Sequence, residues 1–228
     1  MDVEDEIRRE LRTVADPARA PGQQAYMKSS MPFLGVRVPE ARRIARTAGK
    51  RLTDPTAVRE AARRLWEHAE FREEWYAAMA LLGLHSVRGD PANVPLIEQL
   101  VRTGQWWDVT DELAHRLADL HDRHPEQTAA LVLAWCRDDD LWIRRIAILS
   151  QLGRRDRLDR VVLAAVVEPN LADPDFFIRK AIGWALREYA RIDPAWVQAY
   201  ADDHPLSPLR RREALKYLTI PTSPEGLP

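Results

Sequence analysis

Apolar residues recur along the chain at intervals of three and four, with charged residues between them, which is the pattern of amphipathic helices. No segment alternates apolar and polar residues with a period of two, and only 9 of the 228 residues are glycine, so we expect no sheet. The pattern predicts about a dozen short helices joined by tight turns. Proline marks the predicted start of several helices, in "TDPTAV", "VPEARR", "HPEQTA", "ADPDFF", "IDPAWV" and "LSPLRR". Asp-Pro is a start signal because the aspartate accepts from free backbone amides while proline fits the first turn.

The predicted helices repeat at a constant interval. "FREEWYAAMALL" begins at Phe71, "WWDVTDELAHRL" at Trp106, "LWIRRIAILSQL" at Leu141 and "FFIRKAIGWALR" at Phe176, so successive copies lie 35 residues apart. A further copy, "SPLRRREALKYL", follows at a slightly closer spacing. One helix pair per period is typical of a solenoid in which each repeat buries its apolar face on its neighbours. We therefore predict an all-α fold: a right-handed α-solenoid of antiparallel, HEAT-like helix pairs with a concave basic groove. We expect one domain over residues 1–220 and a disordered tail over 221–228.

Composition and charge narrow the function classes. Lys and Arg number 34 and Asp and Glu 35, so a protein that coats nucleic acid by bulk charge is not expected. The acidic N-terminal segment lacks the features of a secretory signal, and no apolar run is long enough to span a membrane. The single cysteine, Cys136, lies in the apolar run "LVLAWCR", where we expect a small core residue. These features predict a soluble, intracellular protein, which we expect to be a monomer.

Two sets of side chains at helical spacing are candidates for a functional site. Trp107 and Asp111 are four residues apart in "WWDVTDE" and therefore share a helix face. Lys180, Trp184 and Arg187 share a face of a later helix by the same argument. Together they predict a groove wall that is basic and aromatic and carries a single acid.

The repeat adds a predicted ladder of equivalent positions on successive helices: Thr110, Arg145 and Lys180, with Arg211 as a possible extension. Basic residues are also dense between Leu141 and Arg191, which suits a polyanion held along one surface. The alternative is that these charges belong to the solvated outer face of a solenoid. Arg145, in particular, is open to a structural interpretation, paired with one of the three aspartates at 138–140.

Purely structural interpretations compete with the functional ones at the other positions too. Tryptophan is usually well buried, so Trp107 and Trp184 are open to assignment as core residues, and we place the other six tryptophans in the core or between helices. Asp111 alone would be an ordinary solvated helix residue. His115, His121 and His124 have loose metal-ligand spacing, but no cysteine or carboxylate completes a site, so we predict no metal.

Several segments together resemble the DNA alkylation-repair family, the AlkD-type DNA glycosylases with HEAT-like repeats. They are "YMKSSMPFLGVRVPEARRIAR", "WWDVTDE", "DDDLWIRRIAILSQL", "FFIRKAIGWALREYA" and "LSPLRRREALKYL", which follow in the family's order from Tyr26 to about Leu218. The resemblance implies a monofunctional glycosylase of base excision repair. It would remove cationic alkylated purines, 3-alkyladenine and 7-alkylguanine, from double-stranded DNA without a metal, a cofactor or a lyase step. It further implies that the lesion stays stacked, and it suggests a cytoplasmic, nucleoid-associated location.

The matching positions also imply roles for individual residues. Asp111 would be the catalytic carboxylate, acting with Trp107, Trp184 and Arg145. Arg187 and Tyr26 would contact DNA, and the predicted ladder adds Lys180 and Arg211 to the DNA-binding set. Arg145 and Arg187 would hold phosphate oxygens, so Arg145→Ala should weaken DNA binding and flatten its salt dependence.

The chemistry explains why one carboxylate is enough. Breaking a glycosidic bond builds positive charge on the sugar, and a fixed carboxylate stabilises that charge. A second, acidic carboxyl group normally protonates the leaving group, but an alkylated purine is already cationic and leaves without it. Indole faces attract cations by roughly 0.5–2 kcal/mol, which would favour a cationic lesion between Trp107 and Trp184.

Two other classes of function stay open at this stage. A helical-repeat protein that binds DNA without catalysis would have no use for Asp111, since a carboxylate repels the phosphate backbone. A protein-protein scaffold would be expected to have an apolar groove, whereas the predicted groove contains arginine and lysine.

Overall fold

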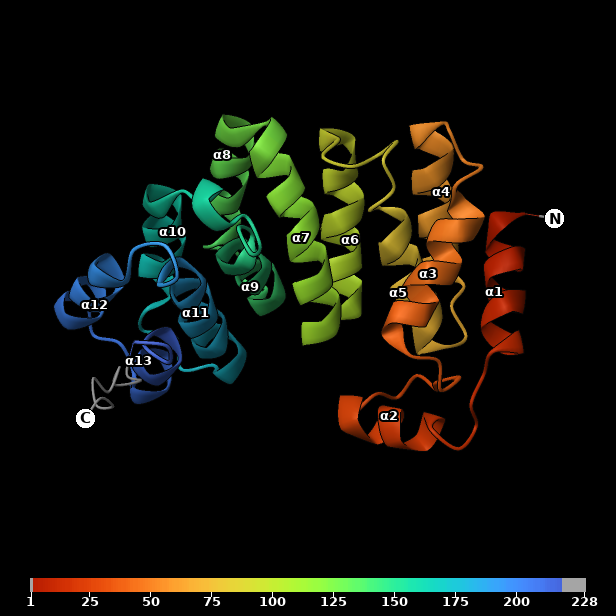
Figure 1. Ribbon diagram of the computed structural model, residues 1–228, viewed down its shortest axis with the longest axis horizontal. Coiled ribbons are helices and arrows are strands. Elements are labelled where there is room, and N and C mark those ends of the chain that lie inside the picture. Colours follow the sequence, from red (N-terminus) through yellow and green to blue (C-terminus); the bar gives the residue numbers. More distant parts are fainter. Residues whose placement is uncertain (1, 219–228) are drawn as a thin grey trace, which may run out of the picture. The chain divides into compact units, whose positions relative to one another are not determined.

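Helices form all the regular structure within residues 2–218, the part of the chain that the computed structural model describes. These residues contain thirteen α-helices and no strand, which confirms the predicted all-α fold (Figure 1). Contacts divide the chain after Thr103 into two compact units, and each is described by itself. The single domain over 1–220 stays a prediction, and the predicted tail over 221–228 lies outside the described residues.

The first unit contains six helices, four of which pack together. The six are α1 (Val3–Thr13), α2 (Ala20–Met27), α3 (Val38–Gly49), α4 (Pro55–Glu67), α5 (Arg72–Leu81) and α6 (Val94–Gly104), with a 3₁₀ turn at Pro91–Asn93 before α6. Helix α5 packs against α1, α3 and α4, and it is buried along most of its length. Trp66 and Trp75 stack at a ring distance of 4.1 Å beside this helix, which agrees with their predicted place between helices.

A buried carboxylate fixes the loop that joins α2 to α3. Glu73, at the start of α5, is fully buried, and its two oxygens accept the backbone N–H groups of Leu34, Gly35 and Val36 at 2.9–3.0 Å. Gly35 has a φ of +84°, and a Cβ there would lie 2.0 Å from the Asp16 carbonyl oxygen. Only glycine therefore fits at this position, where the loop lies directly against the backbone of Asp16.

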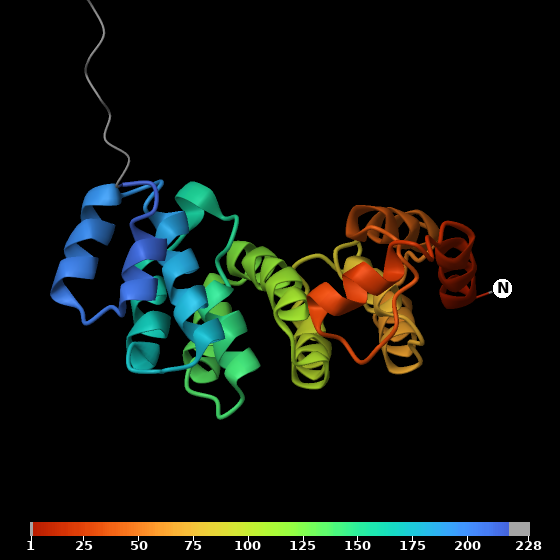
Figure 2. The ribbon, with the colours of Figure 1, turned by 90° about the horizontal axis from the view of Figure 1, so that it is seen from below.

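The second unit is built from two layers of helices. One layer contains α7 (Trp107–Arg123), α9 (Leu141–Leu149), α11 (Phe176–Tyr189) and α13 (Pro208–Ala214), each packed on the next. The other contains α8 (Pro125–Trp135), α10 (Arg160–Val167) and α12 (Pro194–Asp203), with 3₁₀ turns at Arg155–Arg157 and Glu168–Asn170. Figure 2 shows α11 and α13 side by side. This layering is what the 35-residue repeat predicts, because equivalent helices of successive repeats become neighbours.

The repeat register and the start signals are largely confirmed. Helices α5, α7, α9 and α11 begin at or one residue after the four predicted repeat starts. Asp54 and Asp193 cap α4 and α12 before proline, as expected. The "ADPDFF" start is wrong: α11 begins at Phe176, and Asp175, after the proline, accepts the amides of the first turn.

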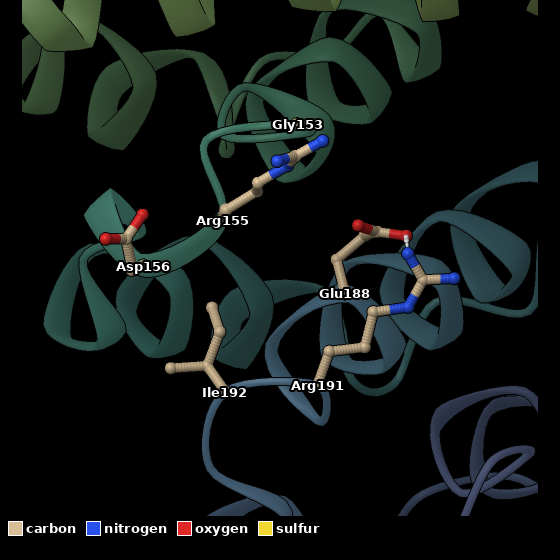
Figure 3. Close-up of a pocket in the computed structure, with 6 residues that line it drawn as sticks. All are labelled: Gly153, Arg155, Asp156, Glu188, Arg191 and Ile192. Atoms are coloured by element: carbon tan, nitrogen blue, oxygen red, sulfur yellow. Dashed lines mark ion pairs between the residues drawn. The ribbon is translucent and has the colours of Figure 1, made fainter.

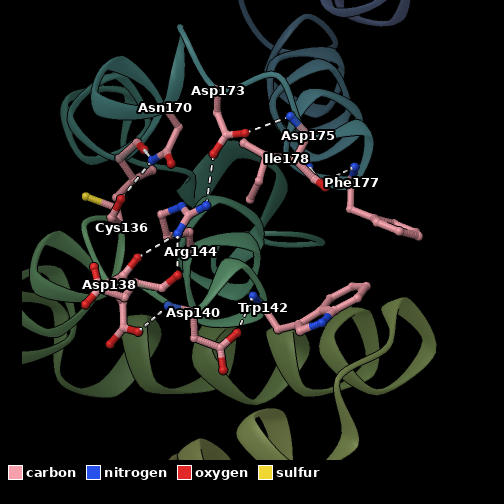
Figure 4. A network of polar contacts seen from close by, with 12 residues as sticks. Cys136, Asp138, Asp140, Trp142, Arg144, Asn170, Asp173, Asp175, Phe177 and Ile178 are labelled. Carbon is pink, nitrogen blue, oxygen red and sulfur yellow. Dashed lines mark hydrogen bonds and ion pairs between the residues drawn. The ribbon is translucent and has the colours of Figure 1, made fainter.

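Two arginines of the second unit, Arg144 and Arg210, hydrogen-bond the turns that precede its helices. Arg144 donates to the carbonyl oxygens of Asp138 and Asp139 in the turn before α9 and reaches Asp173 at 2.9 Å in the turn before α11 (Figure 4). Arg210 contacts the carbonyl of Asp173 from α13. Arg144 therefore hydrogen-bonds the turn before its own helix and the turn before α11, and Arg210 bonds the latter turn, which is a structural role for both.

The remaining predictions about the core concern cysteine and long apolar helices. Cys136 is buried, with its sulfur 3.2 Å from the Leu133 carbonyl oxygen, which confirms it as a core residue. Burial raises the pKa of its thiol, with the charge of Arg137 acting in the opposite direction. Among the described residues, every helix is too short or too polar to cross a membrane.

Candidate active site

Asp111 and Arg145 form a two-point ion pair between neighbouring helices of the second unit. Arg145 Nε donates to Asp111 Oδ1 and Nη2 to Oδ2, both at 2.9 Å. The third nitrogen, Nη1, donates to the Phe177 carbonyl oxygen at 2.6 Å. Asp111 lies on α7, Arg145 on α9 and Phe177 on α11, so one guanidinium connects three helices of the same layer. The parallel fork of two hydrogen bonds fixes the plane of the carboxylate.

The pair is largely withdrawn from solvent. The side chain of Asp111 is 16% exposed and that of Arg145 is 5% exposed. Burial raises the pKa of the Asp111 carboxyl, while the Arg145 charge and its hydrogen bonds oppose the rise. The charges of Asp108 and His115 make smaller contributions in opposite directions. A carboxylate held by a guanidinium in a site with little water interacts strongly with charge that develops beside it.

The arginine pairing differs from the structural alternative considered in the sequence. Arg145 does not pair with the aspartates at 138–140, two of which lend their carbonyl oxygens to Arg144 instead. Asp140 caps the first turn of α9. Arg145 points the other way, to α7, because consecutive helix positions face about 100° apart. The predicted phosphate contact of Arg145 is not supported by this geometry, since the guanidinium is enclosed by Asp111 and Phe177.

The two candidate tryptophans are half-buried. Trp107 lies one helical turn before Asp111 on α7, which agrees with the shared face expected from their spacing. Trp184 lies on α11, and within residues 2–218 its indole has neither a ring contact nor a hydrogen bond. Trp106, by contrast, packs against Trp142 and Phe177 with ring distances of 6.0 and 5.5 Å. The core assignment is thus confirmed for Trp142, and Trp106 packs between helices, while Trp106, Trp107 and Trp184 all keep part of their surface in solvent.

Lys180 and Arg187 are brought together by an acid that was not predicted. Glu213, on α13, accepts from Lys180 Nζ at 2.9 Å and from Arg187 Nη1 at 2.7 Å. The hydrogen bond from Lys180 is the main cause of a lowered pKa for Glu213, opposed by partial burial. Both cations therefore lie on the same face of α11, as expected, but the expectation of a single acid beside them is wrong.

The rest of the predicted ladder does not form. Thr110 is fully buried, and its hydroxyl donates to the Trp106 carbonyl oxygen within α7. Arg211 contacts the carbonyl of Ala201 and the carboxylate of Asp202, both on α12. Equivalent positions of the repeat lie at the same place on their helices, but each side chain bonds whichever partner lies nearest to it. Arg211 stays a predicted DNA contact, although its guanidinium forms an ion pair with Asp202 of α12.

The dense basic stretch is also partly neutralised within the second unit. Asp122 pairs with both Arg154 and Arg157, and Arg144 pairs with Asp173. Asp122 lies on α7, outside the basic stretch, and Asp173 lies within it, so a count of basic residues alone overstated the net positive charge.

Tyr26 belongs to the first unit, near the end of α2, and its side chain is exposed, with 74% of its surface in solvent. Its role in DNA binding stays a prediction.

Glu213 and its neighbour Gly183 were missed by the sequence analysis. A Cβ on Gly183 would lie 2.5 Å from the Glu213 Cβ and 3.2 Å from the Arg210 carbonyl oxygen. The glycine thus permits α13 to approach α11 at the residue beside Trp184. A glycine in the middle of a helical pattern was the available signal, because such a residue often marks close backbone approach.

An open pocket of about 770 Å³ lies elsewhere in the second unit. It is lined by the loop between α9 and α10 and by the C-terminal end of α11, and it contains no predicted site residue (Figure 3). Its lining mixes two arginines, Arg155 and Arg191, with two acids, Asp156 and Glu188. Within the described residues, no group of three or more His, Cys, Asp or Glu side chains is arranged to hold a metal ion.

Comparison with known proteins gives a consistent result. The family model described as DNA alkylation repair enzyme matches residues 7–218. A protein from Enterococcus faecalis, described as a predicted DNA alkylation repair enzyme, is 26% identical, with a TM-score of 0.82 over 90% of this chain and 97% of that one. AlkD2 from Streptococcus mutans is 17% identical, with a TM-score of 0.64 over 80% and 90%, and supports the fold. No curated protein matches the chain. The match over nearly all of the helical repeats places this chain in the DNA alkylation repair enzyme family.

Proposed function

We propose that the protein is a monofunctional DNA glycosylase that hydrolyses the N-glycosidic bond of cationic alkylated purines, 3-alkyladenine and 7-alkylguanine, in double-stranded DNA. The observation that carries the proposal is the Asp111 carboxylate, shielded from solvent and fixed through both oxygens by Arg145. It shares a face of α7 with Trp107, in a chain of the DNA alkylation repair family. DNA carrying such lesions is the proposed partner.

The reaction needs little beyond this arrangement. As the bond between C1′ and the purine breaks, its electron pair passes to the purine nitrogen, which neutralises the cationic base. Positive charge then develops on the deoxyribose, where the fixed negative charge of Asp111 stabilises it. Water adds to C1′ and loses a proton, completing the hydrolysis. No acid is needed for the leaving group, which fits a site with one carboxylate at its centre.

Arg145 has a defined place in this proposal. It holds the carboxylate in one orientation, and its charge and hydrogen bonds favour the ionised form of Asp111 against the rise in pKa that burial causes. Orientation matters because a preorganised group reaches the transition state without rearranging. Arg145 is therefore a positioning residue, and Trp107 and Trp184 are the proposed aromatic contacts of the cationic sugar and lesion.

The ion pair also favours a second candidate, a helical-repeat protein that binds DNA without catalysis. A guanidinium that neutralises Asp111 between α7 and α9 is equally suited to joining two repeats. The two functions differ in what happens to a methylated base.

The test is incubation of the purified protein with duplex DNA containing 7-methylguanine, with released base measured by chromatography. Asp111→Asn keeps the size of the side chain but removes its charge, so we expect excision to fall by about a hundredfold or more. Binding to undamaged duplex should change little. Asp119→Asn, a neutralisation on the same helix, serves as the control and should retain excision. Excision by the Asp111 variant at the wild-type rate would exclude the catalytic role, and no excision by the wild type would favour the second candidate.

A further inference from the structure

Glu213 occupies a position that the proposed reaction does not explain. Its carboxylate lies between the ammonium of Lys180 and the guanidinium of Arg187, which are seven residues apart on α11. Their backbone positions are about 10 Å apart along the helix axis, but the two charged groups converge on the oxygens of one carboxylate. Trp184 lies between them in sequence, four residues after Lys180 and three before Arg187, so all three share one face. A single acid from α13 thus bridges the two sides of the proposed aromatic contact.

The bridge is held rigidly from the backbone outward. The Cβ of Glu213 would be 2.5 Å from a Cβ on Gly183, so its stem rests directly on the α11 backbone. The side chains of Glu213 and Arg187 are each 16% exposed, whereas that of Lys180 is 39% exposed. The acid is therefore the enclosed centre of the cluster, and Lys180 is its solvent-facing end.

The charges of the cluster leave one positive charge unmatched. Lys180 and Glu213 neutralise each other in part, and Arg187 completes the group. The ammonium has three donors and the guanidinium five, while one of each is used on Glu213. Donors remain for an anion without breaking the bridge. Since Glu213 is enclosed, an incoming phosphate meets the exposed Lys180 end first, rather than displacing the carboxylate.

We propose that Glu213 is a positioning residue that holds Lys180 and Arg187 on either side of Trp184 as one phosphate-binding unit for the DNA backbone. This rests on the proposed function in so far as DNA is the ligand. In the absence of Glu213, two like charges on one helix face repel each other, and long side chains spread over many rotamers. The acid therefore favours DNA binding, although its own charge opposes it.

The proposal is testable because bulk charge and positioning predict opposite effects of removing the Glu213 charge on DNA binding. Glu213→Gln removes one negative charge, so bulk electrostatics predicts tighter DNA binding with a steeper dependence on salt. Positioning predicts the reverse, because a glutamine amide accepts from one cation and turns an N–H donor toward the other. We expect affinity for an undamaged duplex to fall about five- to tenfold at moderate salt, and the slope of log Kd against log salt concentration to become smaller by about one.

Two further variants separate positioning from charge and from folding. Gly183→Ala changes no charge but forces α13 away, so it should weaken binding and flatten the slope in the same direction. Glu188→Gln makes the same charge change one residue after Arg187, where the acid pairs with Arg191 at 3.6 Å, and should leave binding equal or tighter. Thermal melts of each variant identify any loss of fold.

Fluorescence anisotropy with a labelled undamaged duplex, titrated over a range of NaCl concentrations, gives both quantities. Equal or tighter binding by Glu213→Gln with a steeper slope would overturn the proposal, as would absence of DNA binding by the wild type. Excision of 7-methylguanine is measured separately on the same proteins. If the wild type releases no base while Glu213→Gln still loses affinity and slope, the glycosylase proposal fails and the positioning role stands.

Discussion

Arg145 illustrates how a side chain is assigned at the scale of the residue. Its sequence context, two arginines within an otherwise apolar helix, is compatible with a phosphate contact. Its three nitrogens instead reach Asp111 and the Phe177 carbonyl, and its side chain is 5% exposed. Burial raises the cost of losing either partner, because the charge that remains has no water to replace the lost contact.

The role of Arg145 leads to a specific prediction for substitution. Arg145→Ala leaves the Asp111 carboxylate enclosed without its cation, so its pKa should rise further and the carboxyl should be neutral over a wider pH range. We expect excision to be nearly abolished and the free energy of unfolding to fall by about 3 kcal/mol. The salt slope of DNA binding should not change. Arg145→Lys keeps the charge but not the two-point fork, and should recover part of the excision rate.

Single-turnover excision, chemical denaturation and anisotropy titrations over salt check the three expectations. A slope that becomes smaller by about one in Arg145→Ala would show instead that this residue binds phosphate, as its sequence context suggested.

At the scale of the element, the helices and their register were predictable, whereas their mutual contacts were not. Helix starts follow from local signals: an aspartate before the first turn, proline inside it and a repeat of 35 residues. Local signals failed at "ADPDFF", where two aspartates flank the proline and the second one caps the helix. Glu213 and its two partners are 33 and 26 residues apart, so no periodic pattern indicated their contact. Asp111 and Arg145 were both singled out in the sequence, but their pairing with each other was not predicted.

Helix α7 also contacts α9 through a buried histidine that makes stability depend on pH. His121 is 3% exposed, with its Nε2 atom 3.3 Å from Ser150 Oγ. Burial lowers the pKa of His121 to about 4 from 6.5, and the charge of Arg154 acts in the same direction, against Asp122 and Asp159. The unfolded chain therefore binds a proton between these values while the folded chain does not.

The sign of the effect follows from that difference in proton uptake. Stability due to neutral His121 is fully present above pH 6.5 and decreases as the pH falls toward 4, by at most about 3 kcal/mol. His121→Gln should remove this part of the pH dependence, although it changes the packing at neutral pH. Urea denaturation at several pH values measures it, with His115→Gln, an exposed position on the same helix, as the control. An unchanged pH dependence in His121→Gln would show that other groups cause the acid sensitivity.

At the scale of the whole molecule, positive and negative side chains are nearly equal in number. The chain has 34 basic and 35 acidic residues, and Arg144, Arg154 and Arg157 of the second unit pair with nearby acids. Affinity for DNA therefore has to come from a few local cations. This is compatible with an enzyme that samples DNA and releases it, because weak, salt-sensitive contacts allow movement along the duplex.

The expected number of phosphate contacts follows from the site. Lys180, Arg187 and Arg211 are the basic side chains proposed for the DNA backbone. Each neutralised phosphate contributes about −0.9 to the slope of log affinity against log salt, so we expect a slope of about −3 for an undamaged duplex. Anisotropy titrations between low and moderate NaCl concentration give this value directly. A slope several units steeper would mean that the wider basic stretch between Leu141 and Arg191 also contacts DNA.

The solitary thiol of this chain has a practical consequence. Cys136 lies where α8 meets α10, with its sulfur 4.0 Å from the Ala165 carbonyl oxygen, and the raised thiol pKa keeps it in the unreactive protonated form. Alkylating reagents act on the thiolate, so they gain access only when these two helices separate. The native protein thus contains its own probe of repeat opening, one that needs neither an added label nor the removal of competing cysteines.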